Sequence, residues 1–137
     1  MEDTIDLSIT RCEWNLNDVL LTRYHDEEWG NPLHNDQMLF EFLSLDAMQA
    51  GLSWNTILRK RENFRQAFDH FEIEVVAAYN ETKIQELLAN PGIVRNKAKI
   101  NAIIHNANRV IEIREQFGSL DHYLWGFIEG KTIQNSW

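Results

Sequence analysis

A long helical repeat in the second half of the chain constrains the fold more than any other feature of the sequence. Apolar residues recur at three- and four-residue intervals from Ile100 to Ile111, which is the spacing of one face of an α-helix. A Pro-Gly turn at 91–92 precedes the repeat and Gly118 follows it, as is typical of helix boundaries. The repeat therefore predicts a long helix with one buried face.

The rest of the sequence also shows helical spacing, and no alternating pattern typical of β-strands competes with it. Residues suited to helix N-caps precede the apolar segments, namely Asp18, Asn35 or Asp36, Ser53 and Ser119. The crowded apolar residues from Met38 to Met48 predict a helix buried on several sides. A last helix is predicted to place on one face Leu120, Tyr123, Leu124, Phe127 and Ile128. We therefore expect an all-α fold.

Length and composition indicate one domain. A chain of 137 residues can bury roughly two thirds of its unfolded surface, and its apolar and charged fractions are ordinary. We expect an N-terminal extension at 1–10 and a helical domain at 11–137, acting as a monomer. No segment is long and apolar enough to cross a bilayer, the acidic N-terminus does not resemble a signal peptide, and the single cysteine suits a reducing compartment. These features predict a cytoplasmic protein without a membrane partner.

Charge is distributed unevenly along the chain. The net charge is −8, yet residues 1–50 carry eleven carboxylates and two arginines, a balance of −9, whereas residues 51–137 carry eleven bases and ten acids, a balance of +1. Seven of the thirteen bases lie in two windows, 59–65 and 95–99. Because phosphate contacts depend on the local field, an acidic chain with two basic windows can still bind a polyanion.

The window at 95–99 opens the second of two predicted helices that a short Pro-Gly turn joins, an arrangement called a helix-hairpin-helix. Such a turn directs backbone N–H groups and a helix N-terminus outward, where phosphate can bind. Lys97 and Lys99 would add positive charge at the flanking phosphates. An ordinary helical connector with a solvated basic face is the alternative interpretation.

The first half of the chain holds a set of aromatic residues with one carboxylate among them: Trp14, Tyr24, Trp29, Asp46 and Trp54. Aromatic side chains usually form the core of a protein. The alternative is a pocket that stacks a flat ligand between rings, in which a carboxylate accepts hydrogen bonds or balances a positive charge. Both interpretations stay open at this point.

Cys12 and His25 are the one pair of residues in the sequence that we consider as metal ligands. One cysteine and one histidine supply at most half of a tetrahedral zinc site. A small buried cysteine is the simpler interpretation of Cys12.

Four segments of the sequence resemble the 3-methyladenine DNA glycosylase I family. They are "RCEWNLNDVLLTRYHDEEWGNPL", "LFEFLSLDAMQAGLSWNTILRKRENFRQAF", "PGIVRNKAKINAIIHNA" and "YLWGFI". The resemblance begins near Arg11 and ends near Ile128, and the order of its motifs makes it specific. It implies an all-helical helix-hairpin-helix hydrolase that excises 3-methyladenine from alkylated double-stranded DNA in base excision repair.

The resemblance also assigns roles to residues. The substrate-binding residues that it implies are Trp14, Tyr24, Trp29, Asp46 and Trp54, with Asp46 also as the catalytic group. The DNA-binding residues that it implies are Gly92, Arg95, Asn96 and Lys97. Cys12 and His25 match two ligands of a structural zinc ion. The basic helix after Trp54 is expected to lie near the DNA backbone, with Trp54 facing the base.

The sequence departs from the family's pattern in three respects. Asp46 stands where the family has a glutamate, so the side chain is one methylene shorter. Leu21 stands where the family has a pocket tyrosine. The family continues beyond the length of this chain and supplies its other two zinc ligands there, so we expect a C-terminally truncated domain with two of four zinc ligands. A catalytically inactive DNA-binding module and a helical interaction protein with a purely structural set of tryptophans are the alternative functions.

Overall fold

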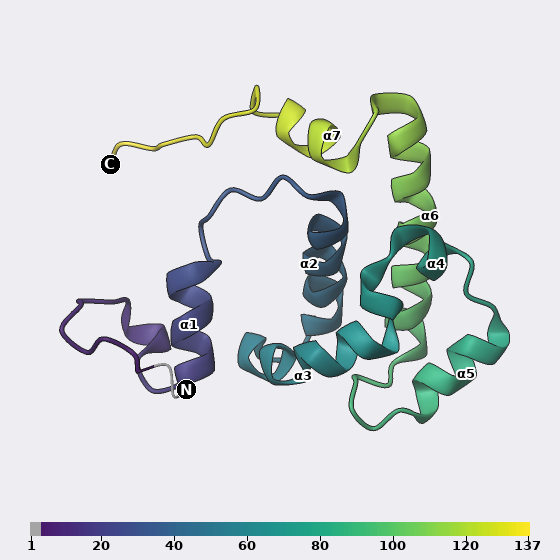
Figure 1. Ribbon diagram of the computed structural model, residues 1–137, viewed down its shortest axis with the longest axis horizontal. Helices are drawn as coiled ribbons and strands as arrows, with labels where there is room; N and C mark the ends of the chain where they lie inside the picture. The colour runs from purple at the N-terminus through teal and green to yellow at the C-terminus, as the bar shows by residue number, and fades with distance from the viewer. Residues whose placement is uncertain (1–3) are drawn as a thin grey trace.

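The computed structural model describes residues 4–137, and this part of the chain contains helices and no β-strand (Figure 1). The α-helices are α1 (Val19–Glu27), α2 (Asp36–Gln49), α3 (Trp54–Ala67), α4 (Ile73–Ala77), α5 (Glu81–Ala89), α6 (Lys97–Phe117) and α7 (Leu120–Gly126). Two short 3-10 turns, η1 (Glu13–Asn15) and η2 (Asp69–Phe71), precede α1 and follow α3. The all-α prediction is confirmed. Within the predicted extension at 1–10, residues 1–3 lie outside the described residues.

Polar side chains begin most of the helices, as the sequence predicts for Asp18, Asn35, Ser53 and Ser119. Each accepts a hydrogen bond from the backbone N–H three residues further on, and they are Asp18, Asn35, Ser53, Asn80, Asn96 and Ser119. A cap of this kind contributes about 1 kcal/mol to the stability of its helix. Gly118 ends α6 with a φ of 89°, a conformation that residues with a Cβ rarely adopt.

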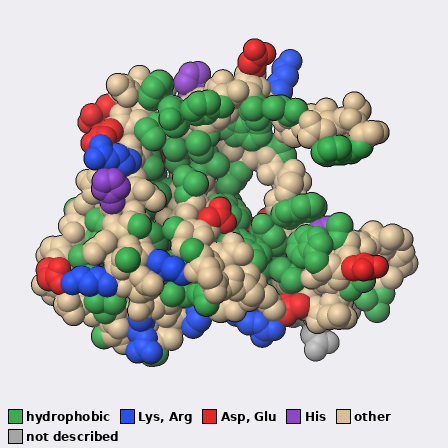
Figure 2. All heavy atoms as spheres, turned by 180° about the vertical axis from the view of Figure 1, so that it is seen from behind, with side chains coloured by type: hydrophobic (Ala, Val, Ile, Leu, Met, Phe, Trp, Pro, Cys, Tyr) green, Lys and Arg blue, Asp and Glu red, His purple; other side chains and the backbone are tan. Residues whose placement is uncertain are grey.

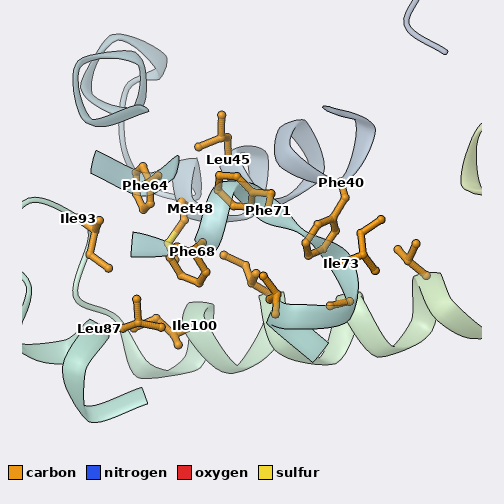
Figure 3. Close-up of a cluster of buried hydrophobic side chains, with 14 of the residues drawn as sticks. Phe40, Leu45, Met48, Phe64, Phe68, Phe71, Ile73, Leu87, Ile93 and Ile100 are labelled. Carbon is orange, nitrogen blue, oxygen red and sulfur yellow. The ribbon is translucent and has the colours of Figure 1, made fainter. Parts of the chain in front are cut away.

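The longest helix, α6, is the support on which the other elements assemble. Helices α2 and α4 pack along it, α5 meets it at the hairpin and α7 packs near its far end (Figure 1). Fully buried side chains from α2, α3, η2 and α6 form a single cluster beside it (Figure 3). Within the cluster, Phe68 and Phe71 stack with ring centroids 5.6 Å apart and planes 4° from parallel.

Two expectations about the core are wrong in part. The helix α2 is buried on one side only, because Met38 and Leu43 are exposed while Phe40, Leu45 and Met48 are buried. The helix α7 ends before Phe127, whose side chain is exposed. The tail after α7 runs as an extended segment away from the helices, and Trp137 is fully exposed (Figure 1). No helix in residues 4–137 has both the length and the apolar character required to span a bilayer.

Candidate active site

The five side chains predicted to bind the base all line one pocket of about 390 Å³. A volume of this size falls within the range of small-molecule sites. The walls come from η1, α1, the last turn of α2 and the first turn of α3. The lining residues are Trp14, Leu21, Tyr24, Trp29, Asp46, Gln49, Ser53, Trp54 and Asn55. Seen from behind, the molecule is hollowed, and hydrophobic side chains gather around the hollow (Figure 2).

The aromatic residues of the pocket form two neighbouring groups. The rings of Trp14 and Trp29 lie 5.6 Å apart in an edge-to-face arrangement, and those of Tyr24 and Trp54 lie 5.5 Å apart. Trp14 is 47% exposed and Trp29 is 53% exposed, whereas tryptophan is usually well buried. Two half-exposed indoles on one pocket favour ligand contact over core packing. Trp54 lines the pocket and also packs against the core cluster.

Local hydrogen bonds place the rings of the N-terminal wall. The backbone N–H of Trp29 donates to the carbonyl of Tyr24 at 2.9 Å, which closes the end of α1 and fixes Trp29 beside Tyr24. The hydroxyl of Thr22 donates to the carbonyl of Asn15 at 2.5 Å and fastens η1 to α1. Since Trp14 belongs to η1, this bond sets its position relative to Tyr24.

Asp18 connects the two walls of the pocket. Its carboxylate accepts hydrogen bonds from the backbone N–H of Leu21 at 3.0 Å, from the side-chain amide of Asn55 at 2.9 Å and from the guanidinium of Arg59 at 2.7 Å. These bonds, led by the one from Leu21, lower the pKa of Asp18, so the carboxylate stays ionised. Because Leu21 belongs to α1 and Asn55 to α3, Asp18 holds the spacing between the helices that line the pocket.

Asp46 is a carboxylate without a cationic partner. It opens on the pocket from the last turn of α2, and no basic side chain within residues 4–137 lies at ion-pair distance from it. Partial burial raises its pKa above the ordinary value of 3.8. Burial first, and the charge of Asp46 next, also raise the pKa of Tyr24, so that hydroxyl stays protonated. An unpaired carboxylate among aromatic rings is suited to a positively charged, flat ligand.

Three polar residues of the pocket were not predicted from the sequence. Gln49 and Asn55 carried no recognisable signal, and Ser53 was interpreted only as a helix cap. Ser53 does cap α3, and it lines the pocket as well. The buried side-chain oxygen of Asn55 and indole N–H of Trp54 have no hydrogen-bond partner in the described chain.

Three arginines of the basic run on α3 form ion pairs within the chain. Arg61 pairs with Glu28 at 2.7 Å and with Glu41 at 3.2 Å, and Arg65 pairs with Glu41 at 2.6 Å. These two arginines therefore hold α3 against α1 and α2, and the proximity of this helix to the DNA backbone stays a prediction. Arg59 is likewise paired, with Asp18.

The predicted hairpin is present between α5 and α6. Its turn is tight at Gly92, where a Cβ would come within 3.1 Å of both Asn63 and Asn90. The side chain of Asn90 accepts from the N–H of Gly92 at 2.8 Å, and Asn63 donates to the Gly92 carbonyl at 3.2 Å. Arg95 and Lys97 are exposed beside the start of α6. The geometry is therefore open to an approaching phosphate.

Asn96 is the N-cap of α6 in this hairpin. It is exposed, and its side-chain oxygen accepts from the N–H of Lys99 at 3.0 Å, which caps α6. Lys97 makes only a long ion pair with Glu81 at 3.7 Å, and both side chains are more than half exposed. Such a pair contributes little and exchanges readily for a phosphate.

The predicted zinc ligands do not form a complete site. Cys12 is exposed, while His25 packs against Trp14 and Trp29 and its Nδ1 lies 2.9 Å from the carboxylate of Asp26. Across residues 4–137, no group of three or more histidine, cysteine, aspartate or glutamate side chains could hold a metal ion. Two donors do not fit a tetrahedral zinc ion. Zinc binding therefore stays a prediction.

Sequence comparison decides the family of this chain. The sequence model of the methyladenine glycosylase family matches residues 14–137. The chain belongs to the methyladenine glycosylase family. The predicted resemblance is therefore confirmed, and the pocket and hairpin are those of a methyladenine glycosylase family member.

Relatives of this methyladenine glycosylase family member agree with the assignment. It is 37% identical over 126 residues to the DNA-3-methyladenine glycosylase of Haemophilus influenzae, covering 92% of this chain and 68% of that protein. It is 41% identical over 118 residues to DNA-3-methyladenine glycosylase 1 of Escherichia coli, covering 86% and 63%. A crystal structure of a 3-methyladenine DNA glycosylase I variant with 3-methyladenine superposes with a TM-score of 0.85 at 38% identity, covering 88% and 64%. The chain thus spans about two thirds of the length of these relatives, and the predicted glycosylase-like fold is confirmed.

Proposed function

We propose that this chain is a DNA repair glycosylase that excises 3-methyladenine from alkylated double-stranded DNA. The observation that carries the proposal is the convergence of Trp14, Tyr24, Trp29, Trp54 and Asp46 on one pocket. The names of the relatives support the same substrate. A monomer acting in the cytoplasm is part of the proposal and depends on the sequence alone.

The pocket holds the base by stacking and by charge. A glycosylase must first extrude the nucleotide from the duplex, which costs a few kcal/mol of stacking and pairing. Methylation at N3 places a positive charge on adenine, and each aromatic face attracts a cation by about 0.5–2 kcal/mol. Asp46 adds the attraction of a full negative charge and accepts a hydrogen bond from the exocyclic amino group. An unmethylated adenine lacks the charge that both interactions favour.

Cleavage needs little acid catalysis, because the substrate base is already positive. The N-glycosidic bond breaks with its electron pair moving to the base, which leaves as neutral 3-methyladenine. The sugar then carries positive charge, which the carboxylate of Asp46 stabilises. Water adds at C1′ and its proton passes to solvent. The hairpin around Gly92, with Arg95 and Lys97 beside it, holds the phosphate backbone during this sequence.

A base-release assay on methylated duplex DNA tests the proposal directly. The expected result is release of free 3-methyladenine by the purified chain above the spontaneous rate, with no release of adenine from undamaged DNA. DNA binding without release would instead favour the inactive DNA-binding module, for which Leu21 in the pocket wall is the supporting observation. Absence of salt-dependent DNA binding would favour the interaction protein.

Excision is expected to decline as pH falls because Asp46 must be ionised to attract the cationic base. Its pKa is raised, so the carboxylate becomes neutral at a pH above the ordinary value of 3.8. The measurement is the single-turnover rate against pH with the protein in saturating excess over methylated DNA, corrected for spontaneous depurination. The excision rate of Asp46→Asn should show no such decline at low pH. A decline in the rate of the unaltered chain with its midpoint at or below pH 3.8 would contradict this assignment.

A further inference from the structure

Lys99 lies in the hairpin, but its ammonium is engaged within the chain. It belongs to the first turn of α6, and its backbone N–H is held by the Asn96 cap at 3.0 Å. Its side chain crosses to α2, where the ammonium donates to the carbonyl of Met48 at 2.8 Å and to that of Ala50 at 2.6 Å. The expectation that Lys99 contacts a flanking phosphate is therefore corrected.

These two carbonyls lie at the C-terminal end of α2, where backbone acceptors lack partners within the helix. The carbonyl between them, that of Gln49, accepts from the N–H of Leu52 at 2.6 Å. Lys99 thus satisfies the acceptors that the turn itself leaves open. A cation at this end also interacts favourably with the helix dipole.

The segment that Lys99 holds is part of the pocket wall. Asp46 precedes Met48 by two residues, and Trp54 follows Ala50 by four. Gln49 and Ser53, between them, line the same pocket. One side chain therefore ties the start of the hairpin helix to the turn that sets the relative positions of the carboxylate and the indole.

We propose that Lys99 is a positioning residue that couples the DNA-binding hairpin to the base pocket. When the hairpin engages phosphates, the ammonium transmits its position to the turn at 49–54 and thereby to Asp46 and Trp54. The inference rests on the proposed function, and it assigns Lys99 a role that differs from that of its neighbour Lys97. Lys97 is exposed and available to phosphate, whereas two of the three ammonium protons of Lys99 are already donated within the chain.

Two measurements on Lys99→Met distinguish a positioning residue from a phosphate contact. The first is the salt dependence of binding to undamaged duplex, since loss of one phosphate contact reduces the slope by about 0.9. Lys99→Met should keep the slope, and Lys97→Met should reduce it. The second is the affinity for free 3-methyladenine, followed by tryptophan fluorescence, which should fall about tenfold or more in Lys99→Met through misplacement of the wall.

Matched variants separate positioning from general damage. Lys99→Arg retains donors for both carbonyls and should recover most of the affinity for 3-methyladenine. Lys131→Met, in the exposed tail, removes the same charge elsewhere and should change neither measurement. Should Lys99→Met fail to fold by circular dichroism, Lys99→Gln, whose shorter amide removes the charge and the reach of the ammonium, takes its place with the same expectations. A reduced slope with unchanged affinity for 3-methyladenine would overturn the proposal.

Hydrogen exchange tests the coupling independently of 3-methyladenine binding. A failure of the chain to bind 3-methyladenine would refute the proposed function and not the coupling. Undamaged duplex DNA should slow amide exchange at 49–54 in the unaltered chain and in Lys99→Arg, but not in Lys99→Met. Equal slowing in Lys99→Met would show that the turn responds to DNA without Lys99 and would overturn the inference.

Discussion

Asp46→Asn is expected to lower the rate of 3-methyladenine excision on the order of a hundredfold, while binding to undamaged DNA stays the same. The amide keeps the size of the side chain but removes the negative charge from a pocket in which no basic side chain of residues 4–137 balances it. Electrostatic groups that act on charge developing in a transition state commonly contribute effects of this size. The measurement is single-turnover base release from methylated duplex.

Two controls make this expectation specific to Asp46. Glu13→Gln removes one carboxylate charge from exposed η1 outside the pocket lining, and its excision rate should match that of the unaltered chain. Asp46→Glu keeps the charge and lengthens the side chain by one methylene, so it should retain activity. Excision by Asp46→Asn at the unaltered rate would remove Asp46 from the mechanism.

Arg61→Ala is expected to destabilise the fold by about 3 kcal/mol, because it removes a nearly buried guanidinium that pairs with two carboxylates, so that Glu28 loses its partner and Glu41 keeps only Arg65. Arg61 is 11% exposed and Glu41 is 8% exposed. Arg61 also pairs with Glu28 and lies over the ring of Phe42 at 5.0 Å. For a chain of this size the loss corresponds to a fall in melting temperature of about 10 °C. Urea unfolding followed by circular dichroism measures the free energy.

Arg59→Ala is the matched control for Arg61→Ala. Arg59 belongs to the same helix and makes an ion pair of the same 2.7 Å length with Asp18, but its side chain is 65% exposed. Water screens such a pair, so the loss should stay below about 1 kcal/mol. Equal losses for the two variants would mean that burial does not set the strength of these ion pairs.

The sequence was sufficient for features that depend on near neighbours. Helix starts at Asp18, Asn35 and Ser53 were predicted because a cap contacts a backbone N–H only three residues away. The period of apolar residues likewise located α6. These signals are local, and no knowledge of the tertiary arrangement is needed to recognise them.

Features that depend on distant partners could not be predicted in the same way. The sequence shows the basic run on α3 but not the acidic partners of Arg61. Those partners, Glu28 and Glu41, lie 33 and 20 residues away from Arg61 in the sequence. Lys99 is separated from its acceptor Met48 by 51 residues. The convergence of Trp14, Trp29 and Trp54 on one pocket was predictable only through the family resemblance, since the residues alone favoured a structural core.

The close approach at Gly92 has a consequence for how lesions are selected. A Cβ at Gly92 would come within 3.1 Å of the Asn63 side chain, so the hairpin turn lies close against α3, the helix whose first residue is Trp54. The hairpin and the base pocket are thereby joined through α3, which sets the separation between the bound phosphate and the aromatic opening. Only a nucleotide that can swing outward across that fixed gap reaches the rings, so weakly paired or weakly stacked bases enter first.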